Sequence, residues 1–399
     1  MTGPSAPTRQ FYEFFAGGGL ARLGLGADWR CAVANEWAPA KAAAYRAAFG
    51  RTPELRVGDV ADLTTADLPG RADLAWASFP CQDLSLAGAR AGLAGARSGT
   101  FHAFWGLMQG LKAEGRPPKV IALENVTGLL TSAGGCDFAA LTALLADGGY
   151  RVGALTIDAG RFVPQSRPRL FVLAFLPEVA DAVPTDATPD GPFTAAALAR
   201  AVERLAPAAR AAWRWWRLPA PPARNESLID VLEPDEAVDD WHTPEQTRRL
   251  IALMAPASQD KLAALEAAGA RRAATVYRRT RPDDAGGKIQ RAELRDDGLA
   301  GCLRTPAGGS SRQIVLIAEG GQVRTRLLTP REAARLMGAP EDYPTPKNRT
   351  AAYHLFGDAV AVPVVRWLAE RLIEPALAEG RAGANAGAGA ADAPAAAAE

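Results

Sequence analysis

The first 180 residues alternate short apolar runs with helical stretches, and this alternation limits the folds that the chain can adopt. Seven runs have the length of strands: Phe11–Phe15, Arg30–Ala34, Leu55–Val57, Leu74–Phe79, Val120–Leu123, Arg151–Ile157 and Leu170–Phe175. Helical stretches lie between most of them: Leu20–Leu25, Pro39–Phe49, Thr100–Lys112 and Phe138–Asp147. Strands separated by helices pair in parallel, so we predict a doubly wound α/β fold with a mostly parallel sheet. Ligands of such sheets bind at the carboxyl ends of the strands.

The texture of the sequence changes after about residue 183. Pro184–Pro192 is rich in turn residues, Ala195–Leu205 has helical character, and Pro219–Arg224 is a proline-rich connector. Thr243 and Pro244 are typical of a helix start, with threonine as the N-cap and proline at the first helical position. We therefore predict a first domain over residues 9–183 and a smaller, less regular second domain from residue 184.

Composition excludes several classes of protein. The chain has 399 residues, of which 48% are apolar and 22% charged, which favours a globular protein of two domains. The N-terminal residues lack a secretion signal and no run is long enough to span a membrane, so we expect a cytoplasmic protein. Four cysteines without a CxxC motif and three histidines without an HxxxH motif give no support for disulfides or a metal site.

A local excess of basic residues is hidden by a net charge of only +1. Ten basic and five acidic residues lie between Arg271 and Arg312. Such a run occurs on solvated surfaces as well as on nucleic-acid-binding surfaces, so it permits a polyanionic partner without requiring one.

Three successive strand ends carry residues suited to a nucleoside. Phe15-Ala16-Gly17-Gly18-Gly19 follows the first strand, and glycines there let the backbone approach a ligand closely. Glu36 follows the second strand, where a carboxylate often binds ribose hydroxyls, and Asp59 follows the third. Each feature alone also occurs as a tight turn or a helix cap. Together they favour a nucleoside cofactor.

A thiol and a carboxylate are predicted at the tips of two further strands. Cys81 follows Pro80 and precedes Gln82, while Glu124 follows the run that ends at Leu123. A lone cysteine is most often a small buried apolar residue, but its polar neighbours do not suit a core strand. A thiolate is a potent nucleophile, so the pair predicts covalent catalysis on a heterocycle.

At this point the sequence resembles the DNA (cytosine-5)-methyltransferases, which use S-adenosylmethionine. The motifs that carry the resemblance occur in the family's order across nearly the whole chain. They are Phe14-Phe15-Ala16-Gly17-Gly18-Gly19, Asn35-Glu36-Trp37, Gly58-Asp59-Val60, Phe79-Pro80-Cys81-Gln82-Asp83-Leu84-Ser85, Arg97-Ser98-Gly99-Thr100-Phe101, Glu124-Asn125-Val126, Gln165-Ser166-Arg167-Pro168-Arg169, Arg326–Gly338, Gly357-Asp358-Ala359-Val360 and Val362-Pro363-Val364.

The resemblance implies a cofactor site, an organisation of domains and a departure from the family pattern. It implies a methyltransferase-type sheet, a target-recognition domain over 184–325 and a segment over 326–376 that returns to the catalytic domain. The Ala/Gly-rich composition of residues 377–399 predicts a disordered tail. Asp358 stands where the family usually has asparagine, so we expect Asp358→Asn to keep activity and change the cofactor's Michaelis constant. The implied cofactor residues are Phe15, Ala16, Gly17, Gly19, Glu36, Trp37, Asp59, Val60, Pro80, Thr100, Asp358 and Ala359.

The resemblance also assigns catalytic roles. Cys81 would add to carbon 6 of cytosine, which makes carbon 5 nucleophilic, and a protonated Glu124 would donate to N3. Arg167 and Arg169, two residues apart on an extended segment, would hold the base O2 and orient Glu124. The sequence identifies no base for the carbon 5 proton, and water is our hypothesis.

The target carbon is inaccessible in a duplex, so an enzyme of this type must flip the base. The partner implied is double-stranded DNA, bound by a monomer, and a restriction endonuclease encoded nearby is a further expected partner. The predicted DNA contacts are Ser85, Arg304, Ser310, Arg312 and Gln313. Two alternatives stay open: methylation of RNA cytosine, and a non-catalytic DNA-binding relative.

Overall fold

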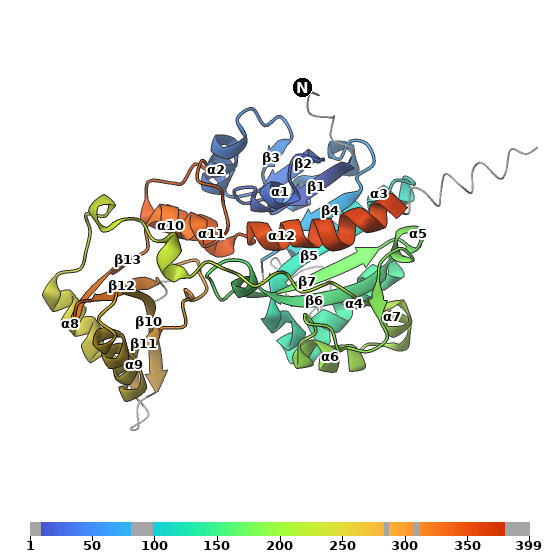
Figure 1. Cartoon of the computed structure of the whole chain (residues 1–399). Helices are drawn as coiled ribbons and strands as arrows, with labels where there is room; N and C mark the ends of the chain where they lie inside the picture. The colour runs from blue at the N-terminus through green and yellow to red at the C-terminus, as the bar shows by residue number, and fades with distance from the viewer. Residues whose placement is uncertain (1–8, 81–98, 283–286, 307–311, 380–399) are drawn as a thin grey trace, which may run out of the picture.

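A computed structural model describes residues 9–80, 99–282, 287–306 and 312–379. Its main feature is a seven-stranded sheet with the order β3-β2-β1-β4-β5-β7-β6 (Figure 1). Its strands are β1 (Arg9–Phe14), β2 (Trp29–Glu36), β3 (Leu55–Val57), β4 (Leu74–Ala77), β5 (Val120–Val126), β6 (Arg151–Asp158) and β7 (Pro168–Phe175). The first five pair in parallel, which confirms the predicted fold class.

Strand β7 is the exception to parallel pairing. It runs antiparallel to both β5 and β6. The reason is the short connection between β6 and β7, which contains only a single turn, Ala159–Arg161, and no crossover helix. A parallel connection needs a dozen or more residues, so this hairpin can only return antiparallel. Every predicted strand is present, although β5 continues through Glu124 rather than ending before it.

Helices cover both faces of this sheet, and the strand residues alternate between two apolar cores. On β1, Phe11 belongs to one core and Tyr12 to the other, and both are fully buried. Burial on both faces explains why the strands read as nearly continuous apolar runs. One face carries α1 (Leu20–Leu25), α2 (Pro39–Phe49) and α12 (Val362–Leu368), and the other carries α3 (Gly99–Ala113), α4 (Cys136–Asp147), α6 (Ala196–Glu203) and α7 (Pro207–Ala212).

Residues 185–216 pack against the first sheet although the sequence changes character before them. Helices α6 and α7 contact α4, and Trp216 donates its indole N–H to the carbonyl of Leu173 on β7 at 3.0 Å. Trp213 packs edge-on against Phe138, so both tryptophans are packing residues of the first lobe. The short elements nearby are α5 (Pro177–Ala180), β8 (Thr185–Asp186) and β9 (Trp215–Trp216). We propose that the second domain begins near Thr243.

A second, antiparallel sheet forms a separate lobe with the order β11-β10-β12-β13 (Figure 1). Its elements are α8 (Pro244–Ala252), α9 (Pro256–Ala267), β10 (Arg272–Pro282), β11 (Lys288–Arg295), β12 (Ile314–Glu319) and β13 (Gln322–Leu327). Thr243 caps α8 by accepting from the backbone N–H of Gln246, as its sequence predicts. The apolar side chains of α8 and α9 pack on one face of the sheet and form a core of their own.

The chain then returns to the first sheet through α10 (Pro330–Arg335), α11 (Arg349–Asp358) and α12, followed by a π turn over Ala369–Ile373. Helix α12 packs against α1. At the start of this return, Arg326 and Glu332 form a fully buried pair joined by two hydrogen bonds of 2.8 and 2.6 Å. In the part of the chain that the structure describes, no helix has the length and apolar character needed to cross a membrane.

Candidate active site

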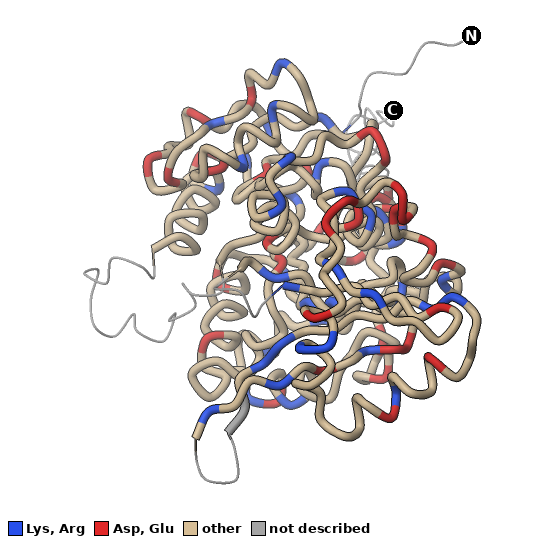
Figure 2. Tube along the Cα trace, turned by 90° about the vertical axis from the view of Figure 1, so that its left-hand side faces the viewer, with Lys and Arg blue, Asp and Glu red and all other residues tan. Residues whose placement is uncertain are grey.

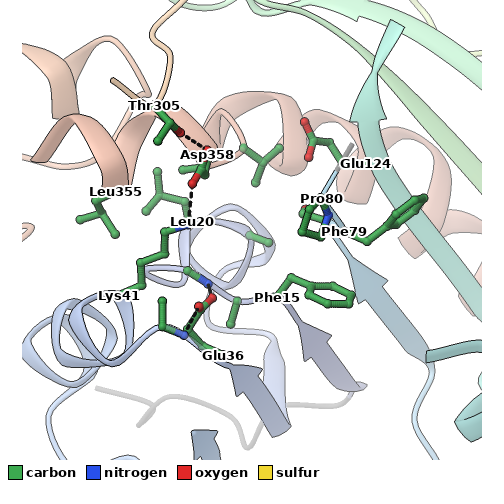
Figure 3. Close-up of a pocket in the computed structure, with 18 of the residues that line it drawn as sticks. Phe15, Leu20, Glu36, Lys41, Phe79, Pro80, Glu124, Thr305, Leu355 and Asp358 are labelled. Carbon is green, nitrogen blue, oxygen red and sulfur yellow. Dashed lines mark hydrogen bonds and ion pairs between the residues drawn. The ribbon is translucent and has the colours of Figure 1, made fainter. Parts of the chain in front are cut away.

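A cavity of about 490 Å³ opens at the carboxyl ends of β1, β2, β4 and β5. This active-site cavity is where the doubly wound sheet is expected to bind a ligand. Figure 3 shows Lys41, Asp358 and Thr305 together on one side, Glu36 below them, and Glu124 with Pro80 on the opposite side. Three groups of polar residues therefore face one space.

The glycine turn after β1 is shaped by a carboxylate from β2. Phe15 and Gly17 both have left-handed backbone angles with φ of 57°. Glu36 accepts hydrogen bonds from the backbone N–H groups of Gly17 and Ala38, each at 2.8 Å. Gly18 has no room for a side chain, because an added Cβ would lie 2.3 Å from the Tyr343 hydroxyl. The turn is thus held in one conformation, with the Glu36 carboxylate lining the cavity.

Glu124 and Arg169 form an ion pair deep in the cavity, with Nε of Arg169 3.1 Å from Oε1 of Glu124. Glu124 is 5% exposed. Burial raises its pKa, although the positive charges of Arg169 and Arg167 and the Ser78 hydroxyl oppose the rise. A carboxyl group with a raised pKa stays protonated to higher pH, which suits a proton donor.

Arg167 is engaged by the chain itself and is 2% exposed. Its guanidinium donates to the carbonyls of Leu303, Gly357 and Ala359 at 2.9, 2.9 and 2.6 Å. The bonds join the β7 edge to segments more than 130 residues away. Its contacts therefore favour a positioning role and give no support to our prediction that it holds the base O2 beside Arg169.

Asp358 is paired in a way that the sequence did not reveal. The Lys41 ammonium lies 2.6 Å from Oδ2 of Asp358, and the Thr305 hydroxyl donates to Oδ1. Burial raises the pKa of Asp358, but Lys41 and Thr305 outweigh it, so the pKa lies below its ordinary value. Asp358 is therefore ionised, and its charge is balanced by Lys41.

Comparison with known proteins decides the family. The profile of the C-5 cytosine-specific DNA methylases matches residues 9–374. The chain belongs to this family. It is 27% identical to the type II methyltransferase M.BsuFI of Bacillus subtilis over 366 residues, covering 91% of this chain and 72% of that protein. It is 25% identical to the type II methyltransferase M.HhaI of Haemophilus parahaemolyticus over 369 residues, covering 90% and 93%.

Solved structures support the fold of this DNA methylase family member. The S. pombe Dnmt2 methyltransferase superposes with a TM-score of 0.55 at 17% identity, covering 92% of this chain and 99% of that one. A putative DNA modification methyltransferase from an E. coli prophage gives a TM-score of 0.55 at 16% identity, covering 94% and 100%. The resemblance inferred from the motifs is confirmed.

In this methylase family member, the active-site cavity gathers many of the predicted site residues. Gly19, Asp59, Val60 and Thr100 do not line it, and Asp59 instead caps a turn by accepting from the backbone N–H of Ala61 at 2.9 Å. Cys81, Ser85 and Ser310 lie outside the described residues. The predicted residues that line the cavity are Phe15, Ala16, Gly17, Glu36, Trp37, Pro80, Glu124, Arg167, Arg169, Asp358 and Ala359.

The remaining predicted DNA contacts of this family member are not gathered at one place. Arg304 is exposed and lies outside the cavity lining. Arg312 lines a separate hollow beside α8 and donates to the Thr350 hydroxyl at 3.0 Å. Gln313 is 7% exposed and packs against Gly301, so its burial gives no support to a base contact. The DNA contacts stay predictions.

Sequence reasoning missed several polar residues of the cavity. Asn125 donates to the carbonyl of Phe79 at 3.0 Å and so fixes the end of β4 that leads to Pro80. Its position beside Glu124 was a usable signal. Glu13, Lys41 and Thr305 also line the cavity, but only three-dimensional packing brings them there.

Proposed function

We propose that the protein transfers a methyl group from S-adenosylmethionine to carbon 5 of a flipped-out cytosine in a specific duplex DNA site. The observation that carries the proposal is the single cavity in which Glu36 and the glycine turn face the Glu124–Arg169 pair, within a chain whose family profile spans residues 9–374. Relatives named type II methyltransferases support an enzyme of the restriction-modification kind.

The cavity residues fit S-adenosylmethionine by the chemistry of their donor and acceptor groups. The Glu36 carboxylate has capacity for further hydrogen bonds beyond those to two backbone N–H groups, which suits a ribose diol. Phe15 and Trp37 supply aromatic surface for a purine, and Lys41 and Asp358 supply opposite charges for an amino acid group. When bound, the cofactor supplies an electrophilic methyl group.

The protein's own residues prepare the base. The Cys81 thiolate forms a bond to carbon 6 while Glu124 gives its proton to N3, so the ring electrons become available at carbon 5. Arg169 holds the Glu124 carboxyl in place through their 3.1 Å contact. After methylation, water takes the carbon 5 proton, the bond between Cys81 and carbon 6 breaks to release the thiolate, and Glu124 recovers its proton from N3. Arg167 braces the segments around this site.

The test is bisulfite sequencing of a plasmid recovered from cells that express the protein. We expect methylated cytosine within one short sequence, and none with Cys81→Ser. Cys136→Ser is the matched control, because Cys136 is an exposed free thiol on α4, and it should methylate normally. Undiminished methylation by Cys81→Ser would contradict covalent catalysis.

A competition assay separates the RNA alternative. Duplex DNA and tRNA are offered together with labelled S-adenosylmethionine, and label is expected in DNA. Label confined to tRNA would replace the proposed substrate. Absence of label from both, together with intact cofactor and DNA binding, would favour a non-catalytic relative.

A further inference from the structure

Lys41 and Asp358 form an ion pair inside the active-site cavity between elements far apart in the chain. Lys41 belongs to the first turns of α2, five residues after Glu36, and Asp358 ends α11. The pair is only partly shielded, with 21% of the Lys41 side chain and 47% of the Asp358 side chain exposed. Both side chains are thus open to a ligand in the cavity.

Among the described lysine and arginine residues that line this cavity, Lys41 is the one available to a cofactor. Arg167 already donates to three carbonyls, and Arg169 is paired with Glu124 at the base-binding side. Lys41 lies instead on the side formed by α2, Thr305 and Asp358 (Figure 3). An anionic group of the cofactor would therefore meet Lys41.

The methionine end of S-adenosylmethionine carries an α-carboxylate and an α-ammonium. An aspartate alone at position 358, where the family usually has asparagine, would attract the ammonium but repel the carboxylate. A lysine beside the aspartate turns this repulsion of the carboxylate into attraction. An ion pair whose members lie 2.6 Å apart offers both charges at the spacing of a zwitterion's two charged groups.

We propose that Lys41 binds the α-carboxylate of the methyl donor while Asp358 accepts from its α-ammonium, so that the Lys41–Asp358 pair recognises the amino acid end as a zwitterion. This inference rests on the proposed function, and it assigns Lys41 as a binding residue. Without ligand, the two side chains neutralise each other. With ligand bound, Lys41 pairs with the α-carboxylate in place of Asp358, and Asp358 pairs with the α-ammonium in place of Lys41.

Two features of the structure make that exchange favourable. The pair is partly exposed, and ion pairs of this kind contribute little stability by themselves, so opening it costs little. The Thr305 hydroxyl donates to the other oxygen of Asp358, which keeps the carboxylate in place when Lys41 turns to the ligand. The same strand-to-helix junction, β2 to α2, then supplies both Glu36 for the ribose and Lys41 for the carboxylate.

The experiment compares two nucleosides by isothermal titration calorimetry with the full-length protein. One is S-adenosylmethionine, and the other is 5′-methylthioadenosine, which lacks the amino acid end. The variants are Lys41→Met, Asp358→Asn and the double variant. Lys261→Met is the matched control, because Lys261 forms a 2.8 Å ion pair with Asp296 on the second lobe. Circular dichroism melting checks that each variant is folded.

We expect Lys41→Met to weaken the binding of S-adenosylmethionine about tenfold or more and to leave the binding of 5′-methylthioadenosine unchanged. Asp358→Asn keeps an oxygen acceptor, so its effect should be about threefold. The double variant should bind S-adenosylmethionine better than Lys41→Met alone, because it removes the unbalanced Asp358 charge that repels the carboxylate. Lys261→Met should change the affinity for neither ligand.

Two results would overturn the inference. One is an equal loss of both nucleosides in Lys41→Met, which would mean that the pair only shapes the cavity. The other is unchanged affinity for both. If the wild-type protein binds neither nucleoside, the proposed function fails together with this inference, whereas binding of both without discrimination by Lys41→Met removes the inference alone.

Discussion

The active-site end of the seven-stranded sheet and the outer strands β10 and β11 of the antiparallel sheet hold their charged side chains in opposite ways. At the active-site end of the seven-stranded sheet, Glu13 on β1, Glu124 on β5 and Arg167, directly before β7, are 1%, 5% and 2% exposed. On the antiparallel sheet, Arg279 and Glu293 remain partly exposed, with 3.7 Å between Nε and Oε2. Buried charges held at fixed positions suit bond-making at one small ring. Exposed charges suit a long charged polymer that is bound through many separate contacts.

Basic residues recur along the outer pair of strands in the second sheet (Figure 2). Arg279, Lys288 and Arg291 belong to β10 and β11, and Arg279 and Lys288 are exposed. Acidic partners such as Glu293 neutralise only part of this charge. Seven of the ten basic residues in the predicted local excess lie on this pair of strands, which favours contact with phosphates.

The largest effect is expected from Glu124→Gln, which keeps the shape of the side chain and removes its proton. Positioned acids typically contribute 10²–10⁴-fold, so we expect kcat to fall by about a thousandfold with little change in cofactor affinity. Because the pKa of Glu124 is raised, wild-type kcat should decrease as pH rises through that pKa. The alkaline decrease should disappear in Glu124→Gln. If the kcat of Glu124→Gln still falls at alkaline pH, that fall must be assigned to another titrating group.

Glu332→Ala tests what a buried charge costs when it loses its partner. Arg326 would be left fully buried and unpaired, and such losses typically cost about 3–5 kcal/mol. Lys261→Met breaks the exposed pair of the second lobe, for which about 0–1 kcal/mol is expected. Urea unfolding of both variants measures the difference. Equal losses would erase the contrast between buried and exposed ion pairs.

Glu13→Gln tests the buried carboxyl of β1. Burial raises the pKa of Glu13 to about 8, with opposition from Arg22 and reinforcement from Glu36 and Glu54. The folded state therefore binds this proton more tightly than the unfolded state, in which the pKa of the carboxyl is about 4.5. As pH rises from about 4.5 to about 8, the free energy of unfolding of the wild type should fall by about 1.4 kcal/mol per pH unit relative to Glu13→Gln. Parallel pH profiles would contradict this.

The smallest effect is expected from Arg291→Ala on β11. Loss of one phosphate contact should weaken DNA binding several-fold at low salt and reduce the slope of log K against log salt by about one. Arg30→Ala is the matched control, because Arg30 is exposed near the start of β2, at the opposite end of the sheet from the cavity. Fluorescence anisotropy over a salt series measures both. The same slope for both variants would remove Arg291 from the DNA surface.

Much of the first sheet could be predicted because its signals are local. Helices α1 and α2 begin and end where apolar spacing, Pro39 and the glycines Gly26 and Gly50 indicate. The direction of β7 was harder, since its apolar run looks like that of a parallel strand. The short β6–β7 connection decides it. The turn-rich composition of Pro184–Pro192 indicates a domain boundary, whereas the buried Trp213 and Trp216 tie residues 185–216 to the first sheet.

The sequence by itself determined the family and the order of the motifs, and it predicted Cys81, Glu124 and Arg169 as catalytic residues, because these depend on residue type and spacing along the chain. Only the tertiary structure decided that Arg167 braces three distant carbonyls and that Lys41 neutralises Asp358, 317 residues away. Such pairs depend on how helices α2 and α11 pack at the end of a sheet. No local pattern of residues records that packing.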